Sequence, residues 1–422
     1  MNTRKILTIG IIGIVLIVAV SAGLYYQYFT KAPTVKAEIP VAVDENATEE
    51  SVASLVDIIN AFSLDLYKDL CSQSDENEFI SPYSIFVALA MTYEGAQGET
   101  AEQMQEVLGI PQDDNTMQCS FGYLYNLLNQ EKEYTLRTAN ALWTQEGFPF
   151  LSSYLEYLEN YYIAHAQDVD FSKAAQTADI INTWVEEQTN GMIKDFLSSG
   201  DIDPMTRLIL TNAIYFKGDW KHAFDETDTT NSDFILPSGD SVTVPMMHFT
   251  DTDVSFNYTE TDAMQMVELP YKGDDVSMYI LLPTENTMSD FEGMVTLENL
   301  TNWKHQMIPT TLQLSLPRFS LEEEYRVDSA LKTMGMTIPF TTSADFSGID
   351  GAQDLYIEKV KHKALVEVTE QGTEAAAVTS VHMALTAIQP GVIMNCDHPF
   401  LFFIQQNDTG SILFMGKVTN PS

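Results

Sequence analysis

The sequence is poor in cationic side chains and in cysteine. Its 422 residues contain 21 Lys and Arg against 60 Asp and Glu, which gives a formal net charge of −39. Such a charge repels nucleic-acid phosphate and argues against a nucleic-acid partner. The three cysteines, Cys71, Cys119 and Cys396, form no CxxC and fit no zinc spacing. We interpret all three as small buried hydrophobes, with a Cys71–Cys119 disulfide as the minor alternative.

The motifs of common catalytic sites are also missing. The sequence has no GxSxG elbow, no HExxH, no P-loop and no GxGxxG, and its histidines show no metal-ligand spacing. A protease-like enzyme would need a nucleophile constellation, and none is present. The sequence therefore predicts a protein that is not an enzyme and that has no metal site and no cofactor.

One long apolar run is present, at the N-terminus. Arg4 and Lys5 precede an uncharged stretch, residues 6–30, that is rich in Ile, Val and Leu. Its length suits a membrane span, and the positive end is expected to stay inside the cell. We expect a protein anchored in the membrane with its bulk outside. The alternative is a signal peptide cleaved near Ala22, which would give a secreted protein.

The rest of the chain has the pattern of one large α+β domain. The predicted organisation is a signal-anchor at residues 1–26, a flexible linker at 27–50 and the folded domain at 51–422. Helical spacing occurs at residues 55–66, 84–93, 101–108 and 178–189. Strand patterns occur at residues 207–216, 276–282, 311–316, 363–368 and 400–404. No long linker or repeat divides the domain.

Several separate motifs resemble one known family. They are Glu370-Gln-Gly-Thr-Glu-Ala-Ala-Ala-Val-Thr379, Asp397-His-Pro-Phe-Leu-Phe-Phe-Ile404, Phe79-Ile-Ser-Pro-Tyr-Ser84 and Leu210-Thr-Asn-Ala-Ile-Tyr-Phe-Lys-Gly-Asp-Trp220. In this order, over roughly residues 51–421, they resemble the serpins. The resemblance implies a monomer with three β-sheets, about eight or nine helices and an exposed reactive-centre loop near the C-terminus.

The resemblance also implies roles for single residues, in three groups. The hinge comprises Glu370, Gly372, Thr373, Glu374, Ala375, Ala376, Ala377, Val378 and Thr379. The shutter, a polar cluster where the central sheet opens, comprises Ser81, Ser84, Asn212 and His362. The breach, at the top of that sheet, comprises Trp220, Arg318 and Glu370. Residue types alone would favour a purely structural role for the shutter, because buried polar groups commonly satisfy one another.

The hinge sequence has a period of two that the residues themselves show. Uncharged side chains from Thr373 to Met383 alternate with a set that includes Glu374 and His382. A strand made from this stretch would bury one face and expose the other. Inserting about a dozen residues would add roughly a dozen hydrogen bonds at about 1 kcal/mol each, which rivals the whole stability of an ordinary domain. The uncleaved protein is therefore expected to be metastable.

Together these features predict an inhibitor of serine proteases that acts as a suicide substrate. The family spacing from Gly372 places the reactive bond at Thr386–Ala387, with Leu385 or Met383 as alternatives before the bond. A small Thr suits elastase-like or subtilisin-like proteases. The alternative function is a non-inhibitory serpin that serves as a carrier, binding or chaperone module.

Overall fold

The computed structural model describes residues 40–71, 75–111, 116–130, 132–284, 288–373 and 391–422. One compact unit extends from Val41 to Ser422. The predicted anchor, the first part of the linker, the hinge from Glu374 onward and the reactive bond Thr386–Ala387 lie outside the described residues. No helix in the described part of the chain is both long enough and apolar enough to cross a membrane.

The compact unit begins earlier than the predicted boundary at residue 51. Asn126 holds the start of the unit, because it donates to the Ala42 carbonyl at 3.0 Å and accepts from the Ala42 amide at 2.8 Å. The helix that follows already begins at Glu49, where Thr48 and Ser51 exchange hydrogen bonds of 2.9 and 3.1 Å. Only the last two residues of the polar run that suggested a spacer are helical, and these acidic residues lie in the first turn of α2.

Ten α-helices are present in the described residues, slightly more than the eight or nine expected. They are α2 (Glu49–Cys71), α3 (Pro82–Tyr93), α4 (Gly98–Leu108), α5 (Met117–Asn129), α6 (Ser152–Tyr162), α7 (Ala174–Gln188), α8 (Met288–Glu292), α9 (Leu297–Gln306), α10 (Asp328–Met334) and α11 (Ser347–Asp350). The shortest two are α8, with five residues, and α11, with four.

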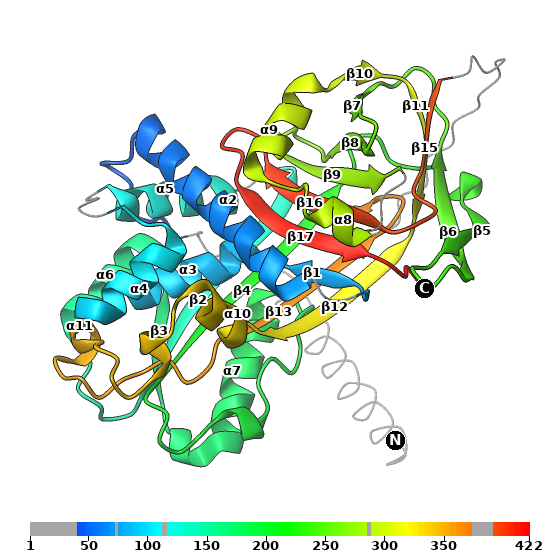
Figure 1. Ribbon diagram of the computed structural model, residues 1–422. Helices are drawn as coiled ribbons and strands as arrows, with labels where there is room; N and C mark the ends of the chain where they lie inside the picture. Colours follow the sequence, from blue (N-terminus) through cyan, green and yellow to red (C-terminus); the bar gives the residue numbers. More distant parts are fainter. Residues whose placement is uncertain (1–39, 72–74, 112–115, 131, 285–287, 374–390) are drawn as a thin grey trace, which may run out of the picture. The chain divides into compact units, whose positions relative to one another are not determined.

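The strands form three sheets, which confirms the predicted α+β class (Figure 1). The seven-stranded sheet has the order β1 (Glu78–Ile80), β17 (Ile412–Val418), β16 (Phe400–Gln406), β9 (Val276–Pro283), β8 (Met264–Pro270), β7 (Phe256–Glu260) and β10 (Ile308–Thr310). The four-stranded sheet has the order β15 (Val392–Asn395), β11 (Leu312–Pro317), β6 (Ser241–Phe249) and β5 (Thr230–Ile235). The six-stranded sheet, called the central sheet below, has the order β12 (Phe319–Arg326), β13 (Lys361–Val368), β14 (Gly372–Thr373), β4 (Leu208–Asp219), β2 (Tyr134–Gln145) and β3 (His165–Val169).

The seven-stranded sheet has apolar residues on both faces. Every residue of β9, β16 and β17 is buried. One face joins the main core, and the other packs Leu281 and Phe403 against Phe291 of α8 and Leu300 of α9. Such coverage explains why these strands appear in the sequence as continuous apolar runs.

Two of the three cysteines have described side chains. Cys119 and Cys396 are buried and carry free thiols. The alternative of a Cys71–Cys119 disulfide is therefore wrong for this structure, and burial explains why both residues act as small apolar side chains.

Candidate functional site

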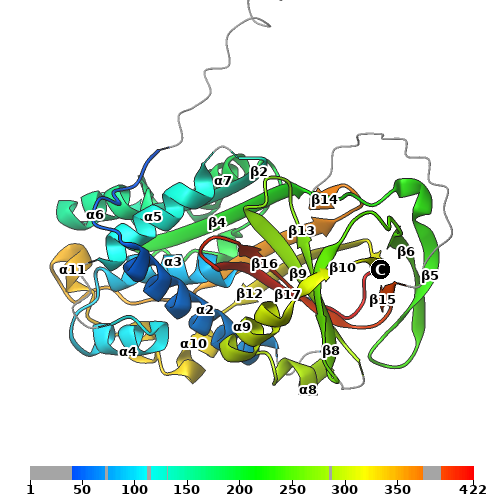
Figure 2. The same ribbon diagram turned by 90° about the horizontal axis from the view of Figure 1, so that it is seen from above.

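The central sheet is divided between β13 and β4. These strands are neighbours only through β14, in which Thr373 faces Val368 on one side and Gly218 on the other (Figure 2). Among the described residues no ladder joins β13 directly to β4. The part of β13 that precedes Val368 and the part of β4 that precedes Gly218 therefore face each other without backbone pairing.

The residues of β14 fit the top of this division closely. Gly372 has a φ of +153°, and a Cβ there would lie 2.1 Å from the Gly218 carbonyl oxygen, so only glycine is accommodated. Thr373 is 2% exposed, and its hydroxyl shares a hydrogen bond of 2.7 Å with the Tyr271 hydroxyl. Thr373 thus has its side chain on the buried face, where the alternation of the hinge sequence would place it.

The three breach residues meet just before β14. Arg318 Nε donates to both carboxylate oxygens of Glu370 at 2.7 Å. Burial alone would raise the pKa of Glu370, but the hydrogen bonds from Arg318 and Thr229 outweigh it and lower that pKa. The Trp220 indole donates to the Thr369 carbonyl at 2.9 Å. This cluster fixes the chain at the point where it enters the sheet.

Two further residues, Tyr271 and Thr229, contribute to the breach, and no sequence pattern predicts either of them. The Tyr271 ring stacks on the Trp220 ring at 4.5 Å between centroids, with an interplanar angle of 18°. Thr229 donates to Glu370 from a segment far away in the chain. Neither residue belongs to a motif, because its role depends only on how distant segments meet in the fold.

The four shutter residues also lie together, beneath the sheet at the start of α3. The Ser81 amide donates to His362 Nε2 at 3.0 Å, and the Ser81 hydroxyl donates to the Leu413 carbonyl at 2.7 Å. Burial lowers the pKa of His362 to about 3, so this ring is neutral near pH 7. The Ser84 hydroxyl donates to the Asn212 side chain. The shutter therefore contacts β13 through Ser81 and β4 through Ser84.

Asn140 of β2 extends this polar cluster and was not among the predicted residues. The side-chain NH2 of Asn212 donates to the side-chain oxygen of Asn140, and the side-chain NH2 of Asn140 donates to the backbone carbonyl of Tyr162 at 2.7 Å. Asn140 is buried at 3% exposure. The register pairs it directly with Asn212, and such cross-strand pairing cannot be deduced before the strand order is known.

Two cavities lie along the division between β13 and β4. A cavity of about 10 Å³ below Thr373 is lined by residues 214–216 of β4 and 365–367 of β13. A cavity of about 400 Å³ further along is lined by residues 208–210 and 212 of β4 and by residues 354–362. The unfilled space thus runs along both strands in the direction that an added strand would follow.

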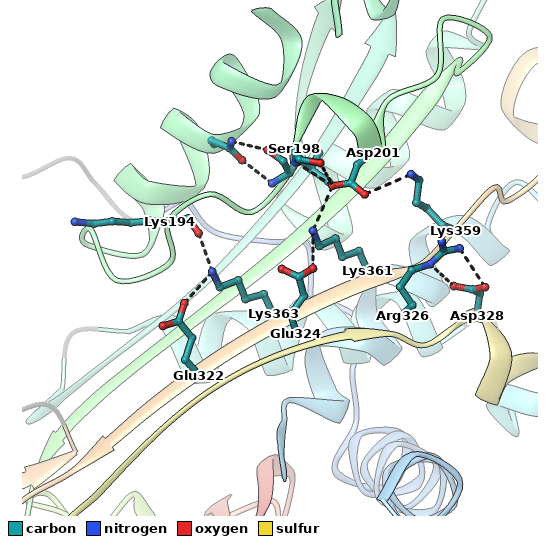
Figure 3. Close-up of polar contacts among 12 residues, drawn as sticks. Lys194, Ser198, Asp201, Glu322, Glu324, Arg326, Asp328, Lys359, Lys361 and Lys363 are labelled. Carbon is teal, nitrogen blue, oxygen red and sulfur yellow. Dashed lines mark hydrogen bonds and ion pairs between the residues drawn. The ribbon is translucent and has the colours of Figure 1, made fainter. Parts of the chain in front are cut away.

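Residues 189–207 connect α7 to β4, and we call this segment the strap. It crosses the division between β13 and β4. The Asp201 carboxylate lies 3.6 Å from Lys359 Nζ and 3.4 Å from Lys361 Nζ (Figure 3). Lys363 Nζ donates to the Lys194 carbonyl at 2.9 Å. Because the strap continues into β4 and these lysines lie on or next to β13, the contacts hold the two sides of the division together.

Asp201→Asn should weaken this strap. Burial alone would raise the pKa of Asp201, but hydrogen bonds from Ser198 and the positive charges of Lys361 and Lys359 lower it to about 2. The contribution of Asp201 to stability is therefore present above about pH 4 and lost as the pH falls towards 2. We expect the variant to lose about 1 kcal/mol in urea unfolding at neutral pH and to respond less to added salt than the wild type.

Lys173→Gln is the control for the strap experiment, because it removes an exposed ion pair with Asp170 at the start of α7. Its unfolding midpoint should stay near that of the wild type. An Asp201→Asn variant with the wild-type midpoint and salt response would contradict the role of the strap.

The fold and the site define a class of protein with three sheets and a central sheet whose strands β4 and β13 are joined only through the short β14. The sequence profile described as Serpin (serine protease inhibitor) matches residues 57–421, so the chain belongs to the serpin family. It is 43% identical over 373 residues to an uncharacterised serpin-like protein of Thermococcus kodakarensis, which covers 87% of this chain and 86% of that protein.

Two further relatives are similar over nearly the whole folded unit. The human leukocyte elastase inhibitor is 40% identical over 374 residues, which covers 85% of this chain and 97% of the inhibitor. The crystal structure of human thyroxine-binding globulin complexed with thyroxine superimposes with a TM-score of 0.80 and 30% identity, covering 88% of this chain and 100% of that chain.

Proposed function

We propose that this protein inhibits serine proteases as a suicide substrate, with insertion of its cleaved loop into the central sheet. The observation that carries the proposal is the division between β4 and β13, of which β14 fills only the top. The chain continues from Thr373 directly into the alternating small residues of the hinge. One face of that stretch matches the buried side on which Thr373 already lies.

The chemistry comes from the target protease. Its serine oxygen attacks the Thr386 carbonyl carbon, the bond to Ala387 breaks, and the Ala387 amine leaves with a proton as a new N-terminus. The loop is then joined to the protease by an ester and is free to enter the sheet. Insertion moves and distorts the protease before water can hydrolyse the ester. This protein contributes no catalytic residue and needs no cofactor.

Elastase-like or subtilisin-like serine proteases are the proposed targets. The support is the small Thr386 and the similarity to the leukocyte elastase inhibitor. The test is to incubate the protein with elastase, subtilisin and trypsin and to look for complexes that survive boiling in SDS. We expect complexes with the first two and a new N-terminus within residues 384–388, as measured by mass spectrometry. A cut outside these residues would contradict the assigned bond.

A carrier function is the second candidate, and the similarity to thyroxine-binding globulin favours it. The same experiment separates the two functions. A carrier would give no covalent complex with any protease, and its loop would be cleaved without loss of protease activity.

We also propose that residues 1–26 anchor the protein in the membrane with the serpin domain outside the cell. The apolar run after Arg4 and Lys5 supports this location. Washed membranes should then retain the protein through salt and carbonate and release it only in detergent. A mature N-terminus near Gly23 would instead support a cleaved signal peptide and secretion.

A further inference from the structure

Four sequences of the form Asn-x-Thr, the acceptor pattern of N-linked glycosylation, lie in the described part of the chain. They are Asn46-Ala47-Thr48, Asn257-Tyr258-Thr259, Asn299-Leu300-Thr301 and Asn407-Asp408-Thr409. A glycan is bulky and hydrophilic, so its acceptor must lie at the surface. The enzyme that transfers it must also enclose the asparagine amide and the threonine hydroxyl together, so both groups must be accessible on a backbone without ladder or helix bonds. The fold separates the four sequences by these requirements.

Asn46 satisfies each requirement. It lies in a β-turn that the Ala47 amide closes by donating to the Asp44 carbonyl at 2.9 Å, and the turn precedes the first residue of α2. Asn46 and Thr48 are both exposed, and the side-chain amide of Asn46 has no hydrogen-bond partner among the described residues. The Thr48 hydroxyl oxygen accepts from the Ser51 amide at 3.1 Å, and within the described part of the chain its proton is not donated.

Asn257 lies in the middle of a ladder. Strand β7 pairs with β8 on one side and with β10 on the other, where Asn257 faces Pro309. The side-chain amide of Asn257 donates to the Glu268 carboxylate at 2.8 Å. The threonine of this sequence, Thr259, is only 7% exposed. An enzyme would reach both groups only after β7 had left the seven-stranded sheet.

Asn299 lies in the first turn of helix α9. Its side-chain amide donates to the Met294 carbonyl at 2.7 Å, and its backbone amide donates to the Thr296 hydroxyl oxygen at 3.2 Å. The Thr301 hydroxyl donates to the Leu297 carbonyl at 2.8 Å. Both reacting groups of this sequence are therefore held by the helix and its cap.

Asn407 lies in the turn between β16 and β17. Its side-chain amide donates to the Asp274 carbonyl at 2.8 Å and to the Ser277 hydroxyl at 2.9 Å. The Thr409 hydroxyl donates to the Gln406 side-chain oxygen at 2.6 Å. Both N–H groups of this amide are occupied, so transfer would first have to break the contacts that join the turn to the strand beside it.

We propose that Asn46 is the N-glycosylation site of this protein and that the fold withholds the other three asparagines. The donor is an oligosaccharide joined through a phosphate to a polyprenyl lipid. The Asn46 amide nitrogen forms a bond with the anomeric carbon of the first sugar. The bond from this carbon to the phosphate oxygen breaks, and the amide loses one proton as the lipid phosphate leaves. The proposal rests on the proposed location of the domain outside the cell and is independent of protease inhibition.

The test uses the purified full-length protein in its folded state. A single-subunit oligosaccharyltransferase and a polyprenyl-diphosphate oligosaccharide are chosen that modify synthetic peptides of all four sequences. The same enzyme and donor are then incubated with the folded protein, and glycopeptides are identified by mass spectrometry after digestion. We expect modification at Asn46. At the other three asparagines we expect rates at least on the order of tenfold lower than in their peptides, because modification must wait for local unfolding.

Thr48→Ser and Thr48→Ala form a matched pair of variants. Serine keeps the hydroxyl that accepts from the Ser51 amide and should still be modified, whereas alanine should not be, although Asn46 is unchanged. Asn46→Gln replaces an exposed side chain, so the variant should fold and should carry no glycan.

An Asn46 that stays unmodified in the folded protein would overturn the proposal. Modification of any of the other three asparagines as fast in the folded protein as in its peptide would also overturn it, because the fold would then not select the site. The assay contains no target protease, so failure to inhibit proteases would leave the result readable.

Discussion

Thr373→Arg should convert the protein from an inhibitor of its target protease into a substrate. Thr373 is already buried in β14, where its hydroxyl meets Tyr271. An arginine there would carry an uncompensated charge towards an apolar environment, at a cost of several kcal/mol. Insertion would slow, while attack on the distant Thr386–Ala387 bond would not. Each ~1.4 kcal/mol added to the free-energy barrier of insertion should raise the ratio of hydrolysed to trapped ester about tenfold.

The measurement is the ratio of cleaved protein to covalent complex on SDS gels, together with recovered protease activity. Thr373→Ser is the matched control, because it keeps the hydroxyl that faces Tyr271 and should still trap the protease. If Thr373→Arg forms covalent complex at the wild-type ratio, loop insertion is not the inhibitory mechanism.

Arg318→Met should destabilise the intact protein by removing the cation beside a buried carboxylate. Glu370 is 2% exposed and has Arg318 as its charged partner. Removing one member of a buried pair costs about 3–5 kcal/mol, and the partial exposure of the Arg318 side chain reduces our expectation to about 2 kcal/mol. The lowered pKa of Glu370 means that its stabilising contribution is present at neutral pH and lost in acid. Urea unfolding at neutral pH measures the loss.

A double-mutant cycle separates the Arg318–Glu370 interaction energy from the effects of each substitution on its other neighbours. Glu370→Gln in the Arg318→Met background should restore part of the lost stability, because the amide leaves no buried charge. Lys221→Met is the control, since its ion pair with Asp274 is exposed and should contribute less than about 1 kcal/mol. Additive effects of the Arg318 and Glu370 substitutions would contradict a direct interaction.

The helices and strands could be predicted from the sequence where their apolar residues recur with the helix or strand period. The expected strand at residues 207–216 became β4 at Leu208–Asp219, and the expected helix at 178–189 became α7 at Ala174–Gln188. Their apolar residues follow the strand and helix periods because each element buries one side or both. The start of the unit was less predictable, since residues 41–50 are packed through contacts with residues far away in the sequence, such as Asn126 and Asn160.

Only those site residues that belong to a recognisable sequence motif could be predicted. Ser81, Ser84, Asn212 and His362 were grouped by their resemblance to a family, and the structure brings them together. Asn140, Tyr271 and Asp201 belong to no motif, and their contacts come from segments that lie far apart in the sequence. Their roles depend on cross-strand pairing and on the path of the strap, which local patterns do not contain.

The place of the last two strands has a consequence for biosynthesis. β17 lies between β1 and β16 in the seven-stranded sheet. β1, one of the first strands to leave the ribosome, therefore cannot pair until β17, one of the last, has been synthesised. The Ser81 hydroxyl likewise waits for the carbonyl of Leu413. Such distant pairing slows folding and leaves strand edges open during translation. A nascent chain that lacks β17 should therefore remain dependent on chaperones, because the seven-stranded sheet cannot be completed without this strand.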